Sequence, residues 1–343
     1  MTASFDPSRT QWGRLPPRLS GASLRKRLAE LRESSEPSVT KQHLVSRVIL
    51  SRFTEHGHGG RELRSYNFVH GTWRDKGVKG CGYLPDWMPK LSSSMEQVWR
   101  GVEDRLHEAL DAVADDNSDD HIPTSVLQET VALHYVRSVP TRVVAQRAGV
   151  EAIAGMRSYW ADDRREEAVQ EFLRRFGRPP LGRDELMQMV NTVVQSHGQQ
   201  EMEVNFRFRA EELLGRVSQS LSSHPVEILS PPKGYEFLIG DTPVVGYRNG
   251  TRASGPASGL GLLAAEYLVM PLTPLHAVRI PAQMELNRVT IGRRELEELN
   301  ATQIRNAYRE VYLRCSATRN HRFVEKRLGE WEGPPEIKPL HTA

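Results

Sequence analysis

Apolar positions recur at helical spacing through most of the first two thirds of the chain. The clearest run lies in residues 93–113, where one face of a predicted helix carries Met95, Val98, Trp99, Val102, Leu106, Leu110 and Val113. Ser93 and Glu96 have the spacing of a capping box and predict the start of this helix. Similar runs predict helices at about 125–138, 162–177, 182–198 and 203–224.

The segment of residues 40–54 has a shorter apolar stripe. Its members recur at helical spacing and are Val45, Val48, Ile49, Leu50 and Phe53. With Thr40 as N-cap, this stripe predicts an amphipathic helix that carries His43 near its start. The following "EHGHGG" breaks the helix, and we interpret His56 and His58 as part of a surface turn, because two histidines without nearby carboxylates make a weak metal site.

The pattern changes at Pro225, where short apolar runs are separated by Pro and Gly. These runs predict strands within residues 226–230, 235–247, 266–280 and 284–292, and an earlier strand is predicted near Ser65. Residues 293–317 predict one long final helix. The whole predicts an α+β fold: a helical body, a mostly antiparallel sheet formed by the C-terminal third and the early strand, and a closing C-terminal helix.

This organisation predicts one main domain between two less structured ends. We expect a basic and polar N-terminal arm at 1–39, a single α+β domain at 40–328 and a loose tail at 329–343. Within the domain, 40–224 is the helical part and 225–328 holds the sheet and the last helix. A short helix with Leu24, Leu28 and Leu31 on one face is predicted inside the arm.

Composition narrows the class of protein. The chain has 343 residues, 38% hydrophobic and 26% charged, with a net charge of +3, which is too balanced to indicate nucleic-acid binding by itself. Cys81 and Cys315 are far apart, which excludes a cysteine zinc site and a disulfide framework. Without an apolar leader or a membrane-spanning run, we expect a cytoplasmic protein without a membrane partner.

Motif searches find no strong catalytic signature. A P-loop, a Gly-x-Ser-x-Gly elbow, a His-Glu-x-x-His motif and a dinucleotide fingerprint are all absent. The "TRVVAQRAGVEAIAGMRSY" segment has the rhythm of a DNA-binding helix-turn-helix, but Glu151, Ala152 and Ile153 would be poor at reading base edges. We therefore favour a corner where two helices pack.

The "FLIGDTPVV" stretch places Asp241 where an apolar strand ends, and Pro243 stiffens the exit. On its own this arrangement favours an Asx-turn, in which the carboxylate accepts nearby backbone N–H groups. Arg137 lies at a helix end before a proline, where its guanidinium could hold a carboxylate bidentately. Glu103 follows the apolar Val102 and so flanks the core, next to Asp104.

Five short motifs occur in the order found in a bacterial family known as domain of unknown function 4238. They are "QHLVSRVILSRFT", "LRSYN", "FLIGDTPVV", "VMPLTPLHAVRI" and "LNATQIRNAYREVY". The chain resembles this family over residues 41–325, with departures at Leu44, Ser46 and Arg47, where the family has Tyr, Pro and Gln. The resemblance implies an architecture and a shared site around His43 and Asp241, and it brings no established reaction.

These residues support two hypotheses of different class. In the first, the protein is a hydrolase of a phosphate ester or nucleic acid, with His43 and Asp241 as catalytic groups. Arg47, Arg52 and Arg137 would bind the anion, and a metal-dependent version would use Glu103 or Asp104 to hold magnesium. In the second, the same residues form a buried hydrogen-bond network in a sensor or protein-interaction module. The sequence leaves the substrate, the cofactor and the oligomeric state open.

Overall fold

The computed structural model describes residues 20–57, 60–88, 92–115, 122–248, 251–252, 262, 265–281, 287–331 and 333. The first 19 residues of the predicted arm, His58 and most of the predicted tail lie outside these ranges. Among the residues that are described, no helix has the length and apolar character needed to cross a membrane.

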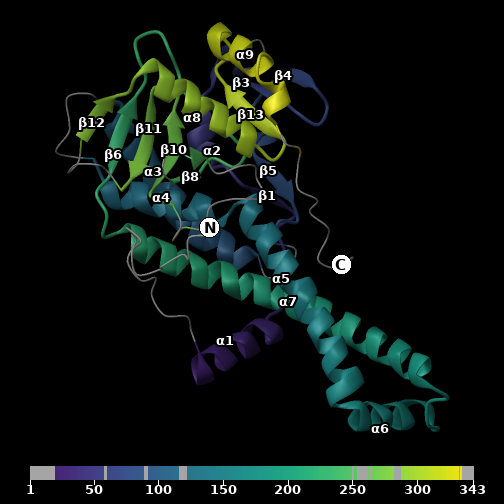
Figure 1. Cartoon of the computed structure of the whole chain (residues 1–343). Coiled ribbons are helices and arrows are strands. Elements are labelled where there is room, and N and C mark those ends of the chain that lie inside the picture. Colours follow the sequence, from purple (N-terminus) through teal and green to yellow (C-terminus); the bar gives the residue numbers. More distant parts are fainter. Residues whose placement is uncertain are drawn as a thin grey trace, which may run out of the picture.

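Helices and strands combine into the α+β fold that the sequence predicts (Figure 1). The α-helices are α1 (Gly21–Glu33), α2 (Arg47–Arg52), α3 (Ser93–Ala114), α4 (Thr124–Val136), α5 (Val139–Ser158), α6 (Arg165–Phe176), α7 (Arg183–Leu221), α8 (Arg293–Asn306) and α9 (Thr318–Glu325). The strands are β1 (Lys41–His43), β2 (Glu55–Gly57), β3 (Gly60–Asn67), β4 (Thr72–Lys76), β5 (Tyr83–Pro85), β6 (Glu227–Ser230), β7 (Ile239–Gly240), β8 (Val245–Arg248), β9 (Thr251–Arg252), β10 (Tyr267–Thr273), β11 (His276–Ile280), β12 (Asn287–Thr290) and β13 (Glu310–Leu313). Short turns of other helix types are η2 (Val78–Gly80), η4 (Tyr159–Asp163) and η6 (Leu328–Glu330).

The strands form two larger sheets and one small one, where the sequence predicted a single sheet. One sheet has the order β12-β6-β11-β10-β8-β9, and the other has β2-β3-β13-β7 with β4 beside β3. Pairing is antiparallel except between β12 and β6. The early strand β3 pairs with β13, with Tyr312 opposite Ser65, which confirms that an early strand joins the C-terminal strands. The small sheet pairs β1 with β5.

The predicted last helix is shorter than its apolar pattern suggests. A C-terminal helix is present, but α8 ends at Asn306 and the chain continues as strand β13. Val311, Tyr312 and Leu313 are all buried, because β13 lies between β3 and β7. An apolar run buried on both faces fits a central strand and a helix equally well by periodicity, so only the pairing partners separate the two.

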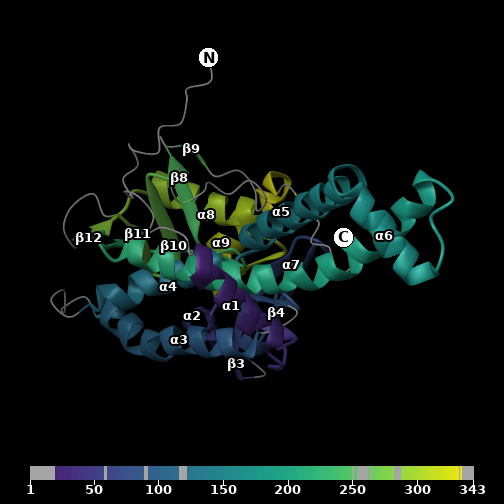
Figure 2. The same cartoon turned by 90° about the horizontal axis from the view of Figure 1, so that it is seen from below.

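The long helix α7 runs beneath the sheets, α4 packs against it, and α3 packs against α4 (Figures 1 and 2). The main core joins these helices to α2 and to strands of both sheets, with Trp87, Trp99 and Phe206 among its large buried side chains. Trp87 contacts both of the others edge to face, at ring-centroid distances of 5.6 and 5.1 Å. Helix α7 itself replaces the two helices predicted at 182–198 and 203–224, because it is one continuous helix of 39 residues.

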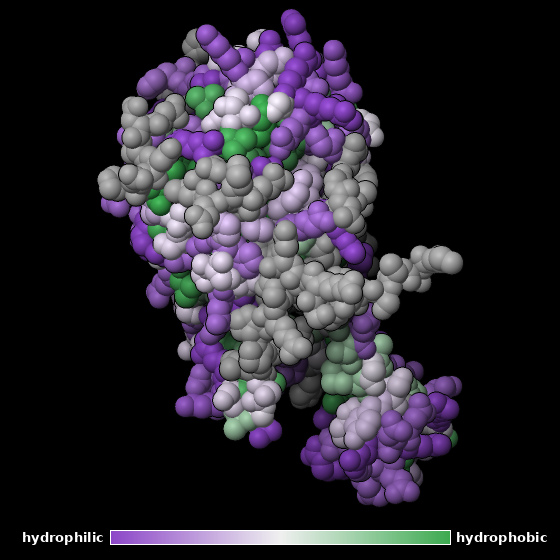
Figure 3. Space-filling model, turned by 60° about the vertical axis from the view of Figure 1, so that its left-hand side comes forward, coloured by the Kyte–Doolittle hydropathy of each residue, from purple (hydrophilic) through white to green (hydrophobic). Residues whose placement is uncertain are grey.

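Helices α5 and α6 and the N-terminal half of α7 extend from the body as a helical projection (Figures 1 and 3). The segment with the helix-turn-helix rhythm is one unbroken helix, α5, so the predicted two-helix corner is wrong. One glycine on each of α5 and α7 has a packing role. A Cβ at Gly149 of α5 would lie 2.7 Å from Met202, and a Cβ at Gly198 of α7 would lie 2.9 Å from Ile153. The small residues thus allow α5 and α7 to approach each other closely.

The N-terminus of α3 is capped from a distance. Ser92 precedes α3 without a side-chain cap, so the predicted capping box of Ser93 and Glu96 does not form. The Glu36 carboxylate instead accepts hydrogen bonds from the Ser94 backbone N–H (3.0 Å) and from the Ser93 and Ser94 hydroxyls (3.1 and 3.0 Å). A carboxylate at this end of a helix is favoured by the helix dipole.

Candidate functional site

His43 is the last residue of strand β1, and not the first turn of a helix as its sequence context predicts. It pairs with Tyr83 of β5, and their ring centroids are 6.2 Å apart. The backbone N–H groups of Leu44 and Val45 then both donate to the Gly82 carbonyl oxygen, at 2.6 and 3.2 Å. This tight turn starts α2 at Arg47 and excludes Thr40 as its N-cap.

A buried histidine holds the turn after His43 in place. The Ser46 backbone N–H donates to Nε2 of His134 at 3.0 Å, and Nδ1 of His134 lies 2.8 Å from the Thr130 carbonyl oxygen. Nε2 is therefore the acceptor and Nδ1 carries the proton, so the ring is neutral. Burial and the nearby charge of Arg137 lower the pKa of His134 to about 3, in agreement with this neutral form.

An ion pair between α3 and α4 lies directly beside this turn. Nη2 of Arg137 donates to Glu103 Oε1 at 2.6 Å, and Ser46 Oγ donates to the same oxygen at 2.5 Å. Arg137 is 1% exposed, and its guanidinium carbon lies 5.0 Å from the ring centroid of Trp99. The predicted anion-binding arginine is thus buried, and its carboxylate partner is the predicted metal candidate Glu103.

Several polar atoms around this ion pair have no partner. Among the described residues, no hydrogen bond reaches His43 Nε2, Glu96 Oε1, Trp99 Nε1 or Arg137 Nε, although all four atoms are buried. Buried polar atoms in folded proteins are nearly always paired, so such a group of atoms indicates water or a ligand. We call His43, Ser46, Glu96, Trp99, Glu103, His134 and Arg137 the His43 site.

The charges of the His43 site separate its ionisable groups into different protonation states. Burial, with the positive charges of Arg47, Arg137 and Lys41, lowers the pKa of His43 to about 4, so the ring is neutral at pH 7. Burial alone would raise the pKa of Glu103, but Arg137 and the Ser46 hydroxyl outweigh it and lower this pKa to about 2. Burial raises the pKa of Glu96, and the charge of Glu103 adds to this effect.

The remaining predicted residues lie around the site or apart from it. Arg47 is exposed and close enough to act on the pKa of His43. Arg52 pairs with α3 instead, through Asp111 at 2.7 Å and the His107 carbonyl at 3.2 Å. Asp104 is exposed, and within the described part of the chain no three His, Cys, Asp or Glu side chains gather to hold a metal ion.

Asp241 lies at the end of β7, in surroundings of a different kind. Its carboxylate accepts backbone N–H groups from Tyr308 (2.6 Å), Arg309 (2.8 Å) and Glu310 (3.0 Å). These bonds close the turn between α8 and β13, which we call the Asp241 turn. Burial raises the pKa of Asp241 to about 7, against the effect of the three backbone bonds.

No described hydrogen bond or ion pair joins His43 to Asp241. A cavity of about 340 Å³ next to Asp241 is lined by Lys76, Tyr83, Glu310 and Tyr312 among others. In it, Lys76 Nζ contacts both Glu310 oxygens at 2.8 Å, and the Tyr312 hydroxyl donates to Glu310 at 2.9 Å. Asp241 therefore belongs to a network in which the polar groups already have partners.

A family model described as "Protein of unknown function (DUF4238)" matches residues 41–316. The chain belongs to this family. Neither the curated proteins nor the solved structures that were compared contain a match.

The part of this DUF4238 chain that the family model matches contains both the His43 site and the Asp241 turn. Helices α1 and α9 lie outside it. Ser46 is a departure from the family resemblance that contributes to the site, since a proline there would lack both the N–H given to His134 and the hydroxyl given to Glu103.

Sequence reasoning missed Glu96, Trp99 and His134 of the DUF4238 chain. A signal for the first two was present: Glu96, Trp99 and Glu103 are spaced i, i+3 and i+7, so they share one face of α3. Two carboxylates on an otherwise apolar stripe mark a polar site inside the core. His134 had no comparable signal, because a histidine within an apolar helix is as often structural as functional.

Proposed function

We propose that the protein is a hydrolase of phosphate esters and that the His43 site binds the phosphate group. The observation that carries this proposal is the set of unpartnered buried polar atoms on His43, Glu96, Trp99 and Arg137. The N–H groups of Trp99 and Arg137 can only donate hydrogen bonds, and a phosphate oxygen can only accept them. A ligand could reach these donors from the surface past three partly exposed side chains, those of His43, Glu96 and Glu103.

The chemistry of the site supports attack by water. His43 Nε2 would accept a proton from water while the water oxygen bonds to phosphorus and the bond to the leaving oxygen breaks. Glu96, whose pKa is raised by burial, would donate the proton that the leaving oxygen needs. A bound phosphate would offset the cations that lower the pKa of His43, and would therefore make this ring a stronger base.

A second function is supported by the Arg137–Glu103–Ser46–His134 contacts. These hydrogen bonds hold α2, α3 and α4 together without requiring turnover. The site could then bind an anion as a sensor or interaction module, with His43 as a recognition group. Asp241 has a structural role in both proposals, because its carboxylate is occupied by three backbone N–H groups.

The experiment compares the parent protein with His43→Ala, Glu96→Gln and the control His107→Ala, whose histidine is exposed on α3. Substrates are p-nitrophenyl phosphate, bis-p-nitrophenyl phosphate, single-stranded DNA and RNA, each with magnesium or with a chelator. We expect turnover by the parent and the control, and a loss of about 10²–10⁴-fold in the two site variants.

A parent without turnover on any substrate would contradict the hydrolase. Calorimetry with inorganic phosphate then tests the sensor: binding by the parent that His43→Ala weakens would support it. Turnover that survives in His43→Ala at the parent rate would place the chemistry elsewhere.

A further inference from the structure

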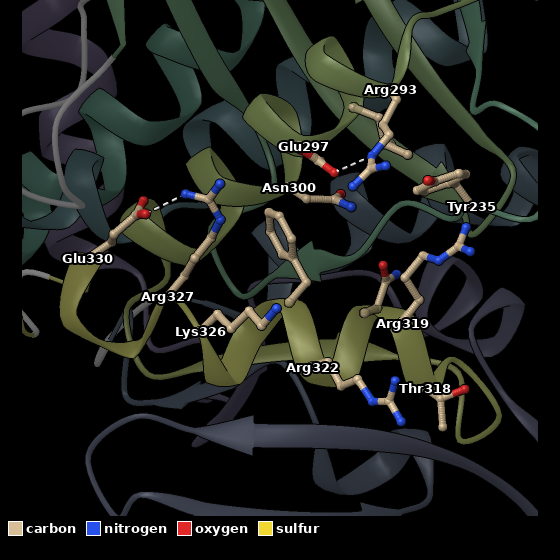
Figure 4. Close-up of a pocket in the computed structure, with 13 residues that line it drawn as sticks. Tyr235, Arg293, Glu297, Asn300, Thr318, Arg319, Arg322, Lys326, Arg327 and Glu330 are labelled. Atoms are coloured by element: carbon tan, nitrogen blue, oxygen red, sulfur yellow. Dashed lines mark hydrogen bonds and ion pairs between the residues drawn. The ribbon is translucent and has the colours of Figure 1, made fainter.

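A second polar cavity lies between α8 and α9, away from the elements that build the His43 site. Its volume is about 690 Å³, and its wall includes Tyr235 of the loop before β7 together with residues of α8, α9 and η6. Figure 4 shows α8 on one side of this cavity and α9 on the other. We call it the α8–α9 groove.

Positive charge dominates the α8–α9 groove. Its lining carries five cations, Arg293, Arg319, Arg322, Lys326 and Arg327, and two carboxylates, Glu297 and Glu330. Both carboxylates are already paired, Glu297 with Arg293 at 2.7 Å and Glu330 with Arg327 and Arg305. An anion that entered the groove would therefore meet cations whose charge is not balanced within it.

Two of these cations are free. Arg322 and Lys326 are exposed, and their side chains have no hydrogen bond or ion pair with any described residue. Lys326, directly after α9, lies on the side that faces α8, and Arg322 extends from the outer side of α9 beside Thr318 (Figure 4). With Arg319 they are spaced i, i+3 and i+7, so the three cations are distributed over about 10 Å of α9 and the residue that follows it.

The aromatic rings of the groove are covered by guanidinium groups. The Arg319 guanidinium lies 3.9 Å from the ring centroid of Tyr235, Arg293 lies 5.5 Å from the same centroid, and Arg327 lies 4.6 Å from that of Phe323. These contacts leave little ring surface on which a nucleobase could stack. The groove therefore offers charge and hydrogen-bond donors, and it does not offer a base-recognition platform.

We propose that the α8–α9 groove binds a row of two or three linked phosphates. A row of cations about 10 Å long suits several phosphates better than one, and the guanidinium groups over Tyr235 and Phe323 compete with a base for these rings. The phosphates could belong to a polyphosphate group or to the backbone of a single-stranded nucleic acid. The proposal does not depend on the hydrolase, because the groove shares no residue with the His43 site.

The test measures binding of inorganic tripolyphosphate, ATP and a fluorescent single-stranded DNA oligonucleotide to the full chain. The variant is Arg322→Gln/Lys326→Gln, and its control Arg100→Gln/Arg294→Gln removes the same charge from exposed positions outside the groove. We expect the variant to weaken binding about tenfold and the control to leave it unchanged. For the oligonucleotide, the slope of log affinity against log salt should fall by about 0.7 per lost phosphate contact.

Comparing the three ligands identifies the source of the phosphates. Equal binding of tripolyphosphate and ATP would support a polyphosphate ligand without base recognition, and binding of the oligonucleotide alone would support a nucleic-acid backbone. Absence of binding in all three arms, or equal weakening by the control, would overturn the proposal. Loss of tripolyphosphate binding in His43→Ala would also overturn it, by placing the anion in the His43 site.

Discussion

Glu103 is a partly buried carboxylate and Asp241 a fully buried one, and their hydrogen-bond partners are of different kinds. Glu103 is held by the side chains of Arg137 and Ser46, next to buried atoms without partners. Asp241 is held by three backbone N–H groups of one turn. The Asp241 carboxylate already accepts three of the roughly four hydrogen bonds open to a carboxylate, whereas the group beside Glu103 has unused donors and acceptors. The comparison separates a structural site from a candidate functional one.

The largest expected effect is on stability, at the Asp241 turn. Asp241→Ala leaves the buried N–H group of Tyr308 and the partly buried N–H groups of Arg309 and Glu310 without an acceptor, and each such group costs about 1–3 kcal/mol when buried. We expect the free energy of unfolding to fall by about 3–6 kcal/mol, measured by urea denaturation followed by tryptophan fluorescence. The free energy of unfolding of Asp241→Asn, which keeps one oxygen, should lie between that of the parent and that of Asp241→Ala. An unchanged stability would show that Asp241 is not the structural member of the pair.

Breaking the ion pair in the His43 site should cost somewhat less. Arg137→Met leaves Glu103 without its cation, a change that costs about 3–5 kcal/mol for a fully buried pair. We expect a value near the lower end, since the Glu103 side chain is still 26% exposed. The double variant Glu103→Gln/Arg137→Met should recover part of this loss in the same denaturation assay. A double variant that is less stable than Arg137→Met would contradict the pairing.

The two regions should also differ in their dependence on pH. The folded pKa values of His43 and His134 are lowered below 6.5 by burial, so between about pH 4 and 6.5 the unfolded chain binds more protons and stability rises with pH. The pKa of Asp241 is raised to about 7 by burial, so over the same range this group makes stability fall as pH rises.

The Asp241→Asn variant removes only the contribution to stability that falls as pH rises. Between pH 4.5 and 6.5, the free energy of unfolding of this variant should therefore rise more steeply with pH than that of the parent, by about 1.4 kcal/mol per pH unit. Urea denaturation at several pH values measures both slopes. Parallel slopes would mean that Asp241 is ionised throughout this range.

The smallest expected effect on stability belongs to His43. Its buried Nε2 has no described partner, so His43→Ala removes no hydrogen bond at that atom, and we expect a change below about 1 kcal/mol. The same variant should lose phosphate binding and turnover under the proposed function. A stability loss as large as that of Arg137→Met, without any loss of phosphate binding, would make His43 structural and would end the contrast with Asp241.

Much of the architecture could be predicted from local pattern. The α3 helix, the early strand and the strands after Pro225 follow from apolar spacing, because each buries one face or a short run against a neighbour. One position of the apolar stripe predicted on α3 is wrong, since Val98 is 50% exposed. Two errors fall at helix boundaries: residues 307–313 were predicted to continue the last helix, and His43 was predicted to begin one.

The site was predicted only in part, for a related reason. His43, Glu103 and Arg137 were selected from residue type and position, and they lie together in the structure. Asp241 was selected in the same way and lies elsewhere. No local signal shows which segments pack against each other. Sequence reasoning therefore could not tell that His43 lies near Glu103 and Arg137, while β7 pairs with β13.

By itself, the sequence determined the α+β class, helix α3 and the strands after Pro225, since these depend on neighbours along the chain. The local turn predicted at Asp241 is wrong, because its carboxylate accepts N–H groups from residues 67–69 positions away. The tertiary structure alone decided that β13 is a strand, that α7 is one helix, and that Ser46, Glu96, Trp99 and His134 surround His43. The physical reason is that strand pairing and buried hydrogen bonds join residues far apart in sequence. His134, for example, is 88 positions from the Ser46 N–H that it binds.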